Sequence, residues 1–164
     1  MSSFEQLLRA ATFAAALGSG LIAGAFFAFS TFVMKALARL PAREGVAAMQ
    51  SINVVVINPL FLGVFLGTAA LSVVAAVGAV ARWNHRGAGC LLLGAALYLF
   101  GTFLVTVAFN VPLNNALAAV PASHPDAPHH WARYVSRWTA WNHVRTLAAL
   151  AATAAFIIAI RLRP

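Results

Sequence analysis

Long apolar stretches, separated by shorter polar segments, dominate the sequence. Four of them, at approximately 8–37, 57–82, 89–112 and 140–162, reach the roughly 20 apolar residues needed to cross a bilayer. Backbone groups cannot stay unpaired in hydrocarbon, so each stretch is expected to be a helix. The first stretch runs on to about Met34, which is far longer than the roughly 7–15 apolar residues of a secretory signal. The pattern predicts one all-α domain over residues 1–164, an integral membrane four-helix bundle.

Composition supports a membrane protein. The chain is 62% hydrophobic and 9% charged, whereas a soluble domain keeps roughly 25% charged residues. Lys and Arg total 11 against three acids, but the basic residues stand singly at the ends of apolar runs. That placement is typical of anchoring at lipid headgroups, so the expected partner is the bilayer and not nucleic acid. The single cysteine, Cys90, excludes a disulfide within the chain.

An internal similarity suggests two halves. Residues 28–42 align with residues 108–122 at a constant offset of 80, although alanine-rich segments also match by chance. A true duplication would give two parallel helical-hairpin repeats, with Asn58 opposite Asn142. In either case, a chain with four spans places the connections after the first and third spans on one side of the membrane.

That side collects polar side chains. The candidates are Asn53 and Asn58 before the second span, Asn110, Asn114 and Asn115 after the third, and Tyr134, Asn142, His143 and Arg145 around the start of the fourth. Taken singly, each asparagine is best explained as a helix cap. Asn58-Pro59 predicts an N-cap followed by the first helical residue, and Pro112 predicts an end or a kink of the third helix.

The segment "SRWTAWNHVRT" (136–146) places polar side chains where lipid makes them costly. On a helical wheel, Trp138, Thr139, Asn142, His143, Arg145 and Thr146 fill one arc of roughly 160°. Such an arc is expected to face the bundle interior. Arg145 lies at least a turn inside, and all acids are remote in sequence. It must then be satisfied by carbonyls, water, asparagine oxygens or a bound anion.

Other interpretations of these residues stay open. Arg145 could extend outward to the headgroups, and Trp131 is expected in the aromatic belt at the membrane surface. The histidines of residues 124–130 lie near Asp126, but their proline-rich loop has no helical register to fix a metal site. No metal is therefore expected.

Three motifs together, "INVVVINPLF", "FNVPLNNAL" and "WTAWNHVRT", resemble the anthrone oxygenase family of small four-helix membrane proteins. The resemblance covers essentially the whole chain. It implies functional roles for the motif positions Asn58, Asn110, Asn114, Trp138, Asn142, His143 and Arg145.

The resemblance also implies a chemistry, that of an oxidoreductase. We expect a monooxygenase without metal or flavin, acting with molecular oxygen on a lipophilic polycyclic phenol or anthrone. In this hypothesis His143 is the base, and Arg145, Asn142 and Asn58 stabilise the oxyanion. Trp138, Trp141 and Tyr134 would flank the rings, and Asn53, Asn110 and Asn114 would complete the substrate site.

Two alternatives from other classes remain: a non-catalytic binder or carrier of a small amphipathic anion, and an interaction subunit that docks a partner through a polar loop over 113–137. A di-iron carboxylate bundle and a proton-coupled carrier are disfavoured, because no acid lies within a span.

Oligomerisation and orientation are predicted only coarsely. Gly20-xxx-Gly24 and Gly63-xxx-Gly67 allow close packing, either within the bundle or in a homo-oligomer. Arginines in the short connection 82–88 and in the C-terminal tail favour cytoplasmic termini in a bacterial cytoplasmic membrane.

Overall fold

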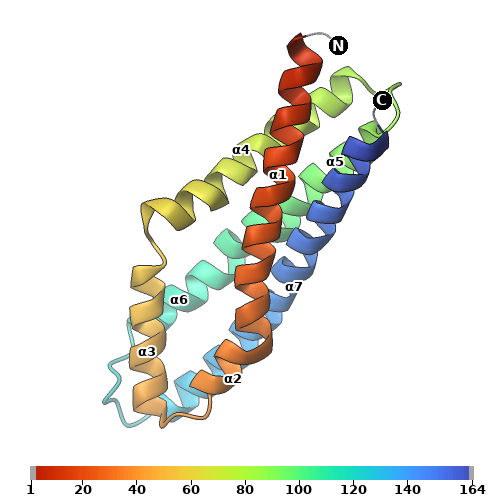
Figure 1. The fold of residues 1–164 in the computed structure, drawn as a ribbon. Helices are drawn as coiled ribbons and strands as arrows, with labels where there is room; N and C mark the ends of the chain where they lie inside the picture. Colours follow the sequence, from red (N-terminus) through yellow and green to blue (C-terminus); the bar gives the residue numbers. More distant parts are fainter. Residues whose placement is uncertain (1–2, 163–164) are drawn as a thin grey trace.

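The computed structural model describes residues 3–162, and this part of the chain forms five helical rods. The fold is all-helical, 87% helical, with no strand in the described residues. Four rods are long and apolar enough to cross a membrane: Ser3–Leu37, Pro59–Ala81, Ala88–Ala118 and Ala127–Leu162. The two termini lie at one end of the bundle (Figure 1). These features confirm the predicted integral membrane four-helix bundle.

Two of the spanning rods are interrupted by π-helical turns. The first rod consists of α1 (Ser3–Ala28), the π-helix η1 (Phe29–Val33) and α2 (Met34–Leu37). The third consists of α5 (Ala88–Ala96), the π-helices η2 (Leu97–Leu104) and η3 (Thr106–Asn110), and α6 (Val111–Ala118). The other rods are α3 (Ala42–Val55), α4 (Pro59–Ala81) and α7 (Ala127–Leu162).

The fourth rod begins earlier than predicted. Helix α7 starts at Ala127 rather than near residue 140, so the polar loop expected over 113–137 shrinks to residues 119–126. The reason is tertiary: Trp131, Tyr134 and Trp138 are all buried in a cluster with α3 and α6. Packing against α3 and α6 stabilises residues 127–139 as a helix, although this stretch is too polar to be predicted as part of a membrane span.

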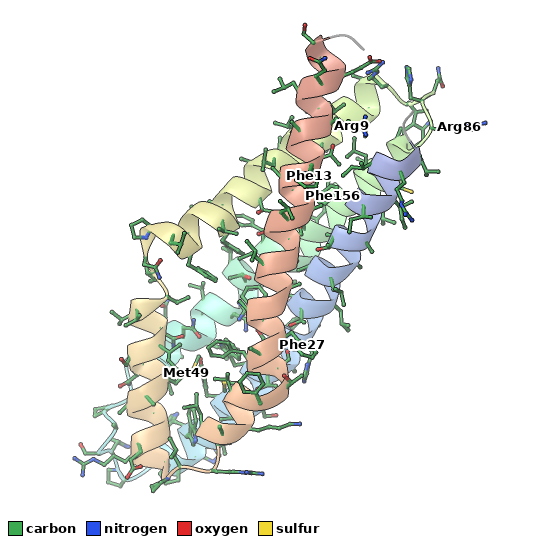
Figure 2. The ribbon with its side chains drawn as sticks, viewed as in Figure 1. Arg9, Phe13, Phe27, Met49, Arg86 and Phe156 are labelled. Atoms are coloured by element: carbon green, nitrogen blue, oxygen red, sulfur yellow. The ribbon has the colours of Figure 1, made fainter. Side chains whose placement is uncertain are left out.

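The segment between the first two spans also contains a helix that the sequence pattern did not predict. Helix α3 lies beside α6 and α7, at the end of the bundle far from the termini (Figure 1). Its buried side includes Gly45, Val46 and Met49, the last labelled in Figure 2. Gln50 donates to the carbonyls of Leu117 and Val120, both at 2.9 Å. The connections after the first and third spans therefore share one side, as predicted.

The expected place of Trp131 in a surface aromatic belt is wrong. Its side chain is only 5% exposed. The ring packs against Gly45 so closely that a Cβ there would lie 2.8 Å from ring carbons. A glycine on α3 thus makes room for the indole.

Pro112 does not end the third rod. It falls in the first turn of α6, directly after the π-helical turn that ends at Asn110. The π turn has already left the α-helical hydrogen-bonding pattern, so the missing proline N–H is less disruptive there.

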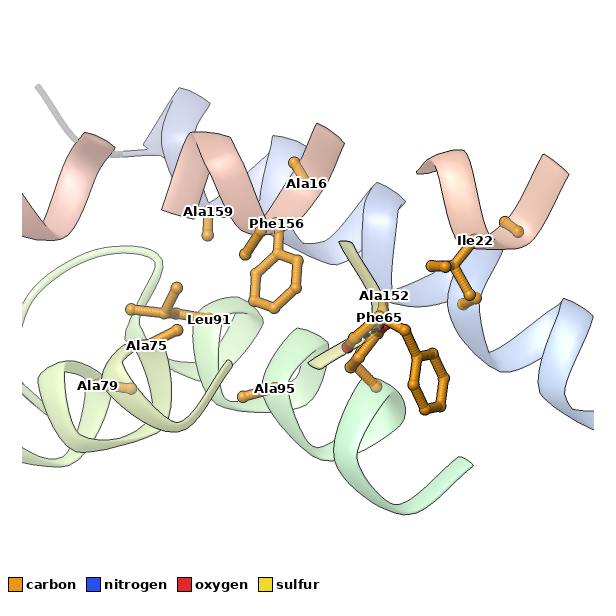
Figure 3. Packing of buried hydrophobic residues seen from close by; sticks show 14 of the residues in the cluster. Ala16, Ile22, Phe65, Ala75, Ala79, Leu91, Ala95, Ala152, Phe156 and Ala159 are labelled. Carbon is orange, nitrogen blue, oxygen red and sulfur yellow. Dashed lines mark hydrogen bonds between the residues drawn. The ribbon is translucent and has the colours of Figure 1, made fainter. Parts of the chain in front are cut away.

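Small residues bring the four spans together. The main core cluster includes Ala16, Ala75, Ala95 and Ala152 together with the Phe156 ring (Figure 3). Large apolar side chains such as Phe13 and Phe27 on α1 are exposed (Figure 2), as expected of a surface that faces lipid.

The glycine motifs behave differently from one another. A Cβ on Gly20 would contact Thr153, whereas nothing lies within 4 Å of the Cβ position of Gly24, Gly63 or Gly67. The Cβ positions of these three glycines thus face open space within the described residues, and a homo-oligomer through them stays a prediction.

The two proposed halves are only partly alike. Each begins with an α-helix that is followed by π-helical turns and a short α-helix, but α5 is much shorter than α1. The second half continues with the unbroken α7, where the first has separate α3 and α4. The duplication therefore stays a prediction.

Candidate functional site

Asn142 is the centre of a buried polar cluster on α7. Its side chain is fully buried. Its Nδ2 donates to the Phe26 carbonyl and to Ser30 Oγ, each at 2.7 Å. Its Oδ1 accepts a hydrogen bond from Arg145 Nε at 2.9 Å. Every polar atom of this carboxamide thus has a protein partner, as a buried amide requires.

The π-helical turns of the neighbouring rods lie level with this cluster. Ser30 belongs to η1, and its Oγ lies 3.2 Å from Thr146 Oγ1. Thr102 of η2 donates to the Arg145 carbonyl, and Thr106 of η3 accepts from Arg145 Nη1, both at 3.3 Å. π-Helical turns occur frequently at functional sites. Here all three supply hydroxyl groups to the same stretch of α7.

The Arg145 guanidinium is buried between two aromatic faces. The residue is 5% exposed. Its Cζ lies 3.8 Å from the ring centroid of Phe26 and 4.9 Å from that of Trp138. Such faces attract a cation through the ring quadrupole, more strongly where water is excluded.

In the described part of the chain, no carboxylate pairs with this cation. The ion pairs within residues 3–162 join Arg82 to Glu5 and His130 to Asp126, and neither involves Arg145. Buried charges are normally paired, so a guanidinium held by neutral groups and rings is suited to an anionic oxygen from a ligand. Among the described residues, no hydrogen-bond acceptor is paired with its second terminal nitrogen, Nη2.

Aromatic and amide side chains extend the cluster toward α6. Asn114 Oδ1 accepts hydrogen bonds from the Tyr134 hydroxyl and from Trp138 Nε1, both at 2.8 Å. Tyr134 and Trp138 stack with ring centroids 6.2 Å apart. Asn110, also fully buried, donates from Nδ2 to the Trp138 carbonyl at 3.2 Å, and its Oδ1 has no protein partner.

The structure thus brings together most of the residues singled out from the sequence. The cluster contains Asn110, Asn114, Tyr134, Trp138, Asn142 and Arg145. Asn53 on α3 lies next to the Tyr134 hydroxyl.

His143 does not join the cluster, which corrects the expectation that the whole polar arc faces inward. Its side chain is exposed. Positions 143 and 145 lie roughly 160° apart around a helix, so one of them must point outward when the other is buried. The side of α7 that packs against other rods is narrower than the polar arc of residues 138–146. Arg145 lies at the buried edge of that arc and His143 at the exposed edge.

Asn58 is a helix cap with only local hydrogen bonds. Its Oδ1 accepts from the Phe61 N–H and its Nδ2 donates to the Val55 carbonyl, both at 3.0 Å. The predicted N-cap is therefore confirmed, and the hydrogen bonds of Asn58 do not reach Asn142 or Arg145. Its predicted part in stabilising an oxyanion stays a prediction. Helix α4 packs mainly against α1 and α5, so its start is not brought onto α7.

Trp141 also lies outside the guanidinium contacts. It stacks face to face on Phe109, with ring centroids 3.7 Å apart and planes 8° apart. The rings that flank Arg145 are instead those of Phe26 and Trp138.

The partners on the other rods were not predicted from the sequence: Phe26, Ser30, Thr102 and Thr106. A signal for two of them was present, because Thr102, Thr106, Asn110 and Asn114 recur every four residues along one rod. That spacing places them on one helical face. Phe26 had no such signal, because it contributes a ring and a carbonyl from an apolar run.

The loop histidines do not form a metal-binding group. His130 Nε2 lies 3.4 Å from Asp126 Oδ2, and His124 Nδ1 accepts from the Asp126 N–H. Within residues 3–162 no three or more His, Cys, Asp or Glu side chains are placed to hold a metal ion.

Fold and site together define a multi-pass helical membrane protein. It buries one arginine, Arg145, that contacts two aromatic rings and has no carboxylate partner within residues 3–162. A sequence profile of the anthrone oxygenase family matches residues 61–155, more than half of the 164-residue chain. The chain belongs to the anthrone oxygenase family. No curated protein and no solved structure matched it. The matched range includes Asn110, Asn114, Trp138, Asn142 and Arg145, but neither Ser30 nor Asn58.

Proposed function

We propose that this protein is a membrane-embedded oxygenase that acts on a lipophilic polycyclic phenol or anthrone-like carbon acid. One observation carries the proposal: the buried Arg145 guanidinium lies over two aromatic faces and, within residues 3–162, has no carboxylate partner. A flat, apolar molecule that becomes an enolate carries its negative oxygen on an aromatic framework. That is the ligand chemistry which such a site favours.

The reaction balances without metal or flavin. The substrate methylene loses a proton, and the electron-rich enolate transfers an electron to dioxygen. The two radicals combine, and the carbon-bound peroxide breaks down to a ketone and water. One dioxygen is consumed and one water is released for each methylene converted to a carbonyl.

In this proposal Arg145 stabilises the enolate oxygen, and Asn142 holds the guanidinium through Nε. Burial strengthens this charge interaction because water is excluded. The exposed His143 is not assigned the role of base, since it lies on the other side of α7 from the guanidinium.

Oxygen uptake by the purified protein with an anthrone tests the proposal. Arg145→Gln is expected to lower kcat by about 10²–10³-fold, the usual effect of losing one oxyanion donor. Arg137→Gln, which alters an exposed arginine on the same helix, is the matched control and should behave as wild type. Equal rates for both variants would refute the role of Arg145.

The same site could serve a binder or carrier of an amphipathic anion, because Arg145 would hold an anionic headgroup equally well. Ligand-dependent thermal stabilisation without oxygen uptake would identify that function. Loss of stability on removing a co-expressed partner would indicate an interaction subunit.

A further inference from the structure

Asn114 joins Tyr134 to Trp138, one of the two aromatic side chains that lie against Arg145. Its Oδ1 accepts one hydrogen bond from the Tyr134 hydroxyl and one from Trp138 Nε1. A carboxamide oxygen has two lone pairs, so both are already used by the protein. The Oδ1 atom of Asn114 therefore has no lone pair left for a substrate, and the hydrogen bonds that it makes serve to hold Tyr134 and Trp138. A substrate contact through Nδ2 stays a prediction.

We propose that Asn114 is a positioning residue that fixes the Trp138 indole plane against the Arg145 guanidinium. An indole has a single polar atom, Nε1, and anchoring it restricts rotation of the ring. The Trp138 backbone is tied by Asn110 Nδ2 to the same rod. The ring held in this way lies with its centroid 4.9 Å from Arg145 Cζ and packs tilted against Phe29 at 5.6 Å.

The contact between the Arg145 guanidinium and Trp138 depends on the orientation of the indole ring. Trp138 is 3% exposed, so little of the indole is open to solvent. Without that acceptor the N–H is buried and unpaired, and the ring is expected to turn toward another partner. Arg145 would then keep its contact with the Phe26 face and lose the one with Trp138.

Two resonances report this coupling without any turnover: the indole N–H of Trp138 and the Nε–H of Arg145, in labelled protein in nanodiscs. Trp138→Phe and Arg145→Lys assign the two signals. Asn114→Leu is expected to move the indole N–H upfield, because its hydrogen bond is lost. It should also shift the Arg145 Nε–H, because the ring current that acts on the guanidinium changes.

Two variants serve as controls. Asn114→Asp keeps both acceptor lone pairs and should retain the Trp138 signal of the wild type. Asn115→Leu changes the exposed neighbour on the same helix and should leave both signals in place. Should Asn114→Leu fail to fold, Asn114→Ser replaces it, because the shorter hydroxyl cannot reach both donors.

A shift of both signals in Asn114→Leu, absent from the two controls, supports the proposal. It is overturned if the Arg145 signal stays in place when the Trp138 signal moves. Only the activity consequence, a fall in kcat of up to about 10²-fold with little change in KM, rests on the proposed function. A wild type without turnover would refute that function and still leave the positioning role testable by the resonances.

Discussion

Asn142 and Arg145 lie one helical turn apart on α7, and the Asn142 carboxamide accepts the Arg145 Nε–H bond at 2.9 Å. The same carboxamide donates to the Phe26 carbonyl, 116 residues earlier in the chain. One fully buried side chain thus connects the cation to the first span. This link makes Asn142 important both for stability and for the orientation of the guanidinium.

Asn142→Leu is expected to destabilise the fold by about 1–3 kcal/mol, because it leaves the buried Phe26 carbonyl and Arg145 Nε without their partner. Unfolding in detergent, followed by tryptophan fluorescence, measures the change. His143→Leu, one position away and exposed, should alter stability by less than about 0.5 kcal/mol. Equal losses in the two variants would contradict the structural difference between these positions.

His143→Ala is expected to keep both the oxygen uptake and the ligand affinity of the wild type, because the exposed imidazole lies away from the guanidinium. Steady-state kinetics with an anthrone provide the measurement. If kcat fell more than tenfold in a folded His143→Ala protein, the imidazole would have to take part in the reaction after all.

Asn58→Ala should lower stability by about 1 kcal/mol, the typical contribution of an N-cap, because the Phe61 N–H loses its acceptor. Asn58→Asp keeps a side-chain acceptor and should recover most of that loss. Ligand affinity, measured by thermal shift, is expected to be the same in all three proteins. A change of ligand affinity in Asn58→Asp would show that Asn58 takes part in ligand binding.

Gly94→Ala on α5 should destabilise the bundle by about 1–3 kcal/mol, because the new Cβ would lie 2.8 Å from the buried Phe156 ring. Gly89→Ala on the same helix meets nothing within 4 Å, so it should be neutral or slightly stabilising through its better helix propensity. Chemical unfolding of both variants under one set of conditions compares them. The reverse order of stability would show that α5 packs differently.

Much of the fold could be predicted from local sequence properties. The length of an apolar run decides whether it can cross a bilayer, and the four predicted spans each lie within or close to a spanning rod. The cap at Asn58-Pro59 is equally local, since its hydrogen bonds reach no farther than three residues. Helix α3 and the early start of α7 escaped prediction, because their polar sequences become helical by packing on each other.

The sequence alone determined that this is a membrane bundle with four spans. It also determined that polar residues gather on the side of the membrane where the second and fourth spans begin. Only the tertiary structure decided that Arg145 faces inward and His143 outward, and that Phe26 and Ser30 meet Asn142. The physical reason is that lipid and protein core are both apolar. Hydrophobicity therefore fixes which segments enter the membrane, while helix rotation is set by side-chain packing and by hydrogen bonds between distant rods.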